Sequence, residues 1–128
     1  MAMDAEQSIV EGFKALSAGR PQAALEAVDA VDADSYPRAS LLAGHAHKAL
    51  GQHAAAESAY RALTQKPDRR HSATGWWSLA GLKTAQFSAA DAARLDSLIN
   101  GDEQDGYLGL LHMTRAEIWH QAGMPDMA

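Results

Sequence analysis

The chain has 128 residues, enough for one domain with a continuous core but too few for two independent ones. Hydrophobic residues make up 47% and charged residues 21%, which excludes a disordered chain, and the net charge of −5 argues against a general nucleic-acid or anionic-membrane binder. The absence of cysteine excludes disulfides, thiolate metal sites and cysteine nucleophiles.

The N-terminal residues carry acidic side chains, whereas a signal peptide needs a basic segment followed by an apolar run. No apolar stretch approaches the ~20 residues that span a bilayer. We therefore expect a cytoplasmic protein that makes no contact with a membrane.

Apolar side chains recur three and four residues apart along most of the chain, which is the spacing of one face of a helix. No alternating run of β-branched residues indicates a strand. We therefore predict an all-α protein of about seven helices. In chain order they cover residues 4–18, 22–31, 37–50, 53–66, 69–84, 88–99 and 107–122.

Residues that begin helices stand between these segments. Pro21 suits the first turn of the second helix, where its missing N–H costs nothing. Asp34 or Ser35 can cap the third helix, and Ser88 with Asp91 has the form of a capping box for the sixth. The larger side chains expected to fill the space between the third and fourth helices are Leu41, Leu50, Tyr60 and Leu63.

Four positions recur in the first two helical hairpins with spacings of 7, 5 and 4 residues and an offset of 32 (44−12). The first small residue lets the partner helix approach, the second permits the turn, and the alanine lies where the two helices cross. The two sets are Gly12, Gly19, Ala24 and Val28, and then Gly44, Gly51, Ala56 and Tyr60.

This pattern resembles a tetratricopeptide repeat, whose period is ~34 residues. The resemblance implies an antiparallel solenoid of helical hairpins in a single domain that covers residues 1–128. Three approximate repeats cover residues 4–34, 36–67 and 70–101, and a partial fourth covers 105–128. The third hairpin matches more loosely, because Phe87 stands where the turn glycine is expected.

The segment Gly75–Thr84, together with Phe87-Ser88 and residues 111–123, resembles the repeat region that precedes the catalytic domain in bacterial tetratricopeptide-repeat sulfotransferases. A sulfotransferase needs a loop rich in glycine and serine to cradle the phosphates of its nucleotide donor. Gly75 and Gly81 lie within a helix pattern and do not form such a loop. The resemblance therefore implies no catalytic residue.

The six histidines do not have the spacing of a metal site. His45 and His47 are two residues apart and point to different faces of a helix, whereas His112 and His120 are eight apart and too distant to share an ion. The carboxylates lie in tails, turns and first turns, where capping and solvation explain them. We expect no metal, no cofactor and no catalytic residue.

In tetratricopeptide repeats the first helix of each hairpin lines a concave groove, so the resemblance implies a site for a protein or peptide partner there. Carried onto this sequence, the inward positions mix apolar anchors with a few polar tips. Phe13, Leu16 and Trp77 could instead belong to the core, and Trp76 cannot share a face with Trp77. The inward positions are Ile9, Phe13, Leu16, Leu41, His45, Lys48, Trp77, Gly81, Thr84, Met113, Glu117 and His120.

The last helix carries two apolar stripes, although a terminal helix of a solenoid is expected to be polar on its outer face. We therefore expect this end of the chain to be covered, by another protein, a second copy or further residues. The residues of this terminal interface are Leu108, Leu111, Ile118 and Trp119.

The sequence thus predicts a non-catalytic protein-interaction module that binds a partner through the groove or the last helix. Two alternatives stay open. The chain could be an accessory or N-terminal part of a sulfotransferase-like enzyme that positions a protein substrate, or a domain that associates with itself through the last helix. These alternatives place different demands on the groove and on the last helix.

Overall fold

The computed structural model describes residues 4–82, 85, 87–100 and 107–121, without the side chains of residues 69, 108, 119 and 121. The described residues form seven α-helices and no strand, so the prediction of an all-α protein is confirmed. The helices are α1 (Ala5–Ser17), α2 (Pro21–Val28), α3 (Pro37–Ala49), α4 (His53–Thr64), α5 (Arg69–Gly81), α6 (Ala89–Ile99) and α7 (Leu108–Gln121). None of them, within the described residues, is both long and apolar enough to cross a bilayer.

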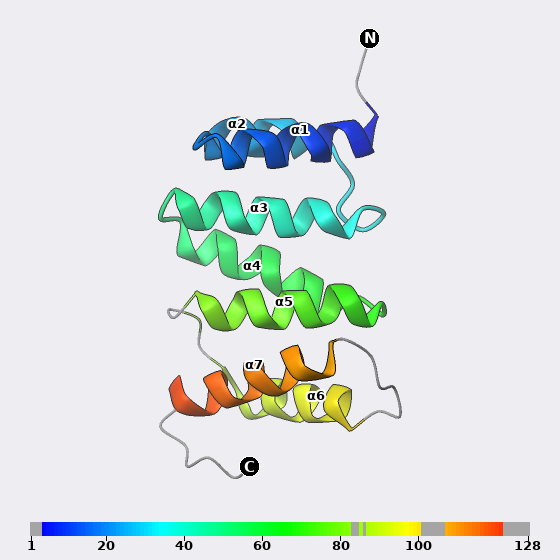
Figure 1. Ribbon diagram of the computed structural model, residues 1–128, viewed down its shortest axis with the longest axis vertical. Helices are drawn as coiled ribbons and strands as arrows, with labels where there is room; N and C mark the ends of the chain where they lie inside the picture. The colour runs from blue at the N-terminus through cyan, green and yellow to red at the C-terminus, as the bar shows by residue number, and fades with distance from the viewer. Residues whose placement is uncertain (1–3, 83–84, 86, 101–106, 122–128) are drawn as a thin grey trace.

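Helices that follow one another from α1 to α5 pack side by side (Figure 1). The odd-numbered helices also contact one another, α1 with α3, α3 with α5, and α5 with α7. At the C-terminal end α7 packs against both α5 and α6 (Figure 1). Side chains on the odd-numbered helices are therefore brought together although they are distant in sequence.

Glycines make two of the turns and two of the close approaches. Gly19 and Gly51 have φ angles of 77° and 75°, which side chains disfavour, and each follows the end of a helix. A Cβ on Gly12 would collide with Leu42, and a Cβ on Gly44 would collide with the ring of Tyr60. These positions have the roles that the recurring spacing predicts.

The core has two parts. The N-terminal part lies between α1, α2 and α3, and the other extends from α4 to α7. The largest fully buried side chains of the described residues include Trp76, Tyr60, Leu42, Leu63, Leu79, Leu95 and Leu111.

The joint between α4 and α6 is polar. Ser88 and Asp91 form the predicted capping box, with each side chain bonded to the backbone of the other residue. The Asp91 carboxylate also accepts a hydrogen bond of 3.1 Å from Arg61 Nη1 on α4. Burial alone would raise the pKa of Asp91, but hydrogen bonds from the Ser88 amide and from Arg61 outweigh it and hold this pKa below its usual value.

Two local predictions were wrong. Neither Asp34 nor Ser35 caps α3, because the Ser35 hydroxyl and the Asp34 amide both donate to Asp32 in the preceding turn, and α3 begins after Tyr36 without a side-chain cap. Leu50 does not fill the space between α3 and α4. It is 37% exposed, because it stands at the C-cap, past the last turn of α3.

Candidate functional site

We call the exposed and half-buried side chains of α1, α3, α5 and α7 the odd-helix face. The stretch of it on α3 consists of Arg38, Leu41, His45 and Lys48, spaced 3, 4 and 3 residues apart, which places them along one side of the helix. Arg38 and Lys48 are exposed, whereas Leu41 and His45 are half-buried. An apolar and a polar group therefore lie between two cations.

Phe13 and Arg38 join α1 to this stretch. The guanidinium carbon of Arg38 lies 5.3 Å from the centroid of the Phe13 ring, within the range of a cation–π interaction. Phe13 also packs against the N-terminal part of the core, so its ring contacts both the core and Arg38. A hollow of about 580 Å³ beside this pair is lined by Val10, Phe13, Lys14, Ser17, Ala18 and Arg38.

His45 is held by a buried tyrosine. Its Nδ1 lies 2.6 Å from Tyr60 Oη, and the two rings meet edge to face with centroids 5.5 Å apart. Gly44 leaves the space that the Tyr60 ring occupies. Burial, and then the charge of Lys48, lower the pKa of His45, and burial raises the pKa of Tyr60 to about 12. Both groups are therefore neutral near pH 7.

The structure separates the two neighbouring tryptophans. Trp76 is 1% exposed and lies in the core, whereas Trp77 is 40% exposed on α5. On α7 Met113 is 57% exposed, His120 is exposed and Glu117 is half-buried. Trp77 and Met113 thus add large apolar side chains to the odd-helix face.

The other predicted groove positions differ in their exposure. Ile9 is only 3% exposed and belongs to the core, because it faces α2 and α3. Leu16 is half-buried against the same cluster, and Gly81 is exposed. Thr84 lies outside the described residues.

Half of the predicted terminal interface is internal. Leu111 and Ile118 are 0% and 3% exposed, because α7 packs this side against α5 and α6. They fill the core of this chain and are not available to a partner. The side chains of Leu108 and Trp119 lie outside the described part of α7, so the open side of this helix is represented by Gly109, His112, Met113, Ala116 and His120.

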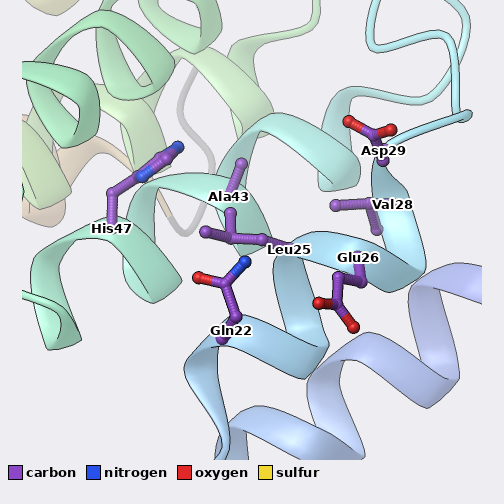
Figure 2. A pocket seen from close by; sticks show the side chains of 7 residues that line it. All are labelled: Gln22, Leu25, Glu26, Val28, Asp29, Ala43 and His47. Carbon is purple, nitrogen blue, oxygen red and sulfur yellow. The ribbon is translucent and has the colours of Figure 1, made fainter.

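A second hollow, of about 590 Å³, lies between α2 and α3 (Figure 2). Glu26 and Asp29 make it acidic, and a hydrogen bond of 2.7 Å between His47 Nδ1 and Gln52 Oε1 fixes the imidazole at its edge. The spacing of residues along a helix cannot predict this hollow, because the hollow depends on how α2 packs against α3. Its lining residues are Gln22, Leu25, Glu26, Val28, Asp29, Ala43 and His47.

Sequence reasoning also missed Arg38 and the bond between His45 and Tyr60. Arg38 was detectable, because it precedes Leu41 by three residues and therefore lies on the same side of the helix as Leu41, His45 and Lys48, which the resemblance to tetratricopeptide repeats implied. The described residues contain no group of three histidine, aspartate or glutamate side chains able to hold a metal ion. The α3 stretch of the odd-helix face offers apolar contact, two cations and an imidazole. Elsewhere this face carries charges of both signs, among them Lys14, Glu11 and Glu117.

Comparisons with protein-family models, curated proteins and solved structures found no match to this chain. The resemblances to tetratricopeptide repeats and to the sulfotransferase repeat region therefore rest on the residues quoted above.

Proposed function

We propose that this chain is a protein-interaction module that binds a segment of a partner protein along its odd-helix face. In this proposal α1 to α4 form two tetratricopeptide-like antiparallel hairpins, and α5 and α7 continue the set of odd-numbered helices. The third hairpin departs from the pattern, because within the described residues α5 packs against α4 and α7 and not against α6. The array positions the side chains and performs no chemistry of its own.

The observation that carries the proposal is where the exposed large apolar side chains lie. Within the described residues there are four of them: Val10, Leu50, Trp77 and Met113. Three lie on α1, α5 and α7, and Leu50 lies at the C-cap of α3. None lies on α2, α4 or α6. Exposed apolar side chains concentrated on one set of helices, beside polar groups, are typical of a surface that binds a partner.

The hairpin geometry supports the array. The turn glycines Gly19 and Gly51 both have positive φ angles, and Ala24 and Ala56 are both fully buried at the same place in their hairpins. A Cβ on Gly12 would also lie 3.5 Å from the Ala24 carbonyl oxygen, so these helices cross where the two small residues meet. The shared turn glycines and buried alanines support the proposal that the first two hairpins are repeats of one another.

The test is a selection of short random peptides displayed on phage, followed by binding measurements with the peptides that are enriched. We expect Trp77→Ala to weaken their binding about tenfold or more, because an exposed aromatic anchor is a frequent source of binding energy. Gln22→Ala is the matched control, because Gln22 is exposed on α2, away from the odd-numbered helices. Gln22→Ala should unfold at the same urea concentration as the parent. Trp77→Ala should stay folded but unfold at a lower urea concentration, because part of its ring is buried.

Two outcomes would contradict the proposal. One is that no peptide is enriched. The other is that peptides are enriched but bind Trp77→Ala as well as the parent and lose affinity for Gln22→Ala, which would move the site to α2 and the hollow beside it.

A further inference from the structure

The cations of this protein differ in whether a carboxylate accompanies them. Lys66 lies 3.4 Å from Asp34, and Arg115 lies 3.2 Å from Asp96. Arg61 bonds both Glu57 and Asp91. Lys14 and Arg70 also have carboxylates within 4.0 Å.

Arg38 and Lys48 have none. Across residues 4–82, 85, 87–100 and 107–121 no carboxylate lies within ion-pair distance of either side chain, although the protein as a whole carries a net charge of −5. Both side chains are exposed, and both lie on the stretch of α3 that belongs to the odd-helix face. Arg20 and Arg94 also have no described carboxylate partner, but they lie in the turn before α2 and on α6, away from the odd-helix face.

Between the two cations His45 adds a directed polar group. The Tyr60 side chain is fully buried, and its only described partner is Nδ1 of His45. Because a buried hydroxyl needs an acceptor for its proton, we assign the O–H of Tyr60 as the donor and Nδ1 as the acceptor. The neutral imidazole then carries its proton on Nε2, which has no described partner and can donate to a carbonyl or carboxylate oxygen.

We propose that the segment bound along the odd-helix face is acidic, with one carboxylate on Arg38, another on Lys48 and an apolar side chain over Leu41 between them. This inference rests on the proposed function and names the chemistry of the partner. The cations are 10 positions apart (48−38), which is about 15 Å along the axis of α3. An extended peptide rises about 3.3 Å per residue, so the two acids should stand four or five residues apart.

The long-range repulsion between an acidic partner and this acidic protein does not prevent such binding. Charges in water are screened within about 8 Å at physiological ionic strength, so the groups in contact determine the interaction. Direct contacts with Arg38 and Lys48 are screened as well. Affinity should therefore fall as salt is added.

The experiment uses the same library of random displayed peptides and reads the charge of the enriched sequences. It is run in parallel on the parent, on the double variant Arg38→Glu/Lys48→Glu and on Arg20→Glu. Arg20 is the matched control, because it is an exposed cation without a described carboxylate partner but lies in the turn before α2. Circular dichroism and urea unfolding confirm that each variant is folded.

We expect the parent and Arg20→Glu to enrich acidic peptides, with acids four or five residues apart. The double variant should bind these peptides at least about tenfold more weakly and should enrich basic peptides instead. Enriched peptides that are neutral or basic in the parent, and that bind the double variant equally well, would overturn this inference and leave the proposed function standing. Enrichment of no peptide by the parent would overturn both.

Discussion

Tyr60 Oη and His45 Nδ1 lie 2.6 Å apart, and this contact ties the buried centre of α4 to the odd-helix face of α3. The ring of Tyr60 occupies the space left by Gly44, so the glycine, the buried phenol and the half-buried imidazole of His45 depend on one another. The arrangement joins the packing of the hairpin to the chemistry of the candidate site.

The first prediction concerns stability and pH. The pKa of His45 is lowered from 6.5 by burial and by Lys48, so the unfolded chain binds a proton at a higher pH than the folded one. The free energy of unfolding should therefore rise with pH from the lowered pKa of His45 up to about 6.5 and should be lost as the pH falls through that window. Urea unfolding between about pH 5 and 7.5 measures the rise, and His45→Gln should reduce its slope. An unchanged slope in His45→Gln would show that His45 does not cause it.

The second prediction separates the two causes of that shift. Lys48→Met removes the nearby positive charge but not the burial, which is the larger cause. The pKa of His45 should therefore rise in this variant and yet stay below 6.5. Titration of the imidazole proton resonances by NMR measures it. A value for His45 at or above 6.5 would contradict the order of the causes.

The third prediction concerns close packing of α3 and α4. In Gly44→Ala the new methyl would lie 2.6 Å from Tyr60 Cδ1, so we expect a loss of about 1–3 kcal/mol in the free energy of unfolding. Gly81→Ala is the control, because a Cβ there meets no atom of the described residues within 4 Å and its backbone is helical. It should gain about 0.4–1 kcal/mol. Thermal or urea unfolding of both variants checks the contrast, and equal effects would contradict it.

The fourth prediction concerns the joint between α4 and α6. Asp91→Asn keeps an acceptor for the Ser88 amide but removes the ion pair with Arg61, and should cost about 1 kcal/mol near pH 7. Because the pKa of Asp91 is lowered on folding, its contribution is present above the unfolded value of 3.8 and is lost as the pH falls through the folded value. The difference between parent and variant should thus shrink in acid. Urea unfolding at about pH 7 and pH 3 measures both differences, and a difference that persists in acid would argue against the ion pair.

Local features of the fold could be predicted from the sequence. The capping box at Ser88 and Asp91 and the turns at Gly19 and Gly51 each depend on a few adjacent residues, so their patterns predicted them. The predicted cap of α3 was wrong because the Ser35 hydroxyl donates to Asp32 in the preceding turn, a local alternative that the sequence pattern does not decide.

The candidate site was predictable only in part. The resemblance to tetratricopeptide repeats selected Leu41, His45 and Lys48, which lie on one side of α3. It could not decide between Trp76 and Trp77, because adjacent residues of a helix differ by about 100° and either could face the core. Leu111 was placed on an open surface because the sequence does not show that α7 packs against both α5 and α6. Which side of a helix is buried depends on its neighbours.

The central claim is that a partner segment lies along the odd-helix face. NMR spectra of the isotope-labelled protein, recorded during titration with the tightest peptide from the selection, test it most directly. We expect the backbone amide signals that shift to cluster on α1, α3 and α5, with the side-chain N–H of Trp77 shifting and that of buried Trp76 nearly unchanged. Shifts confined to α2, α4 and α6, or to the hollow between α2 and α3, would contradict the claim.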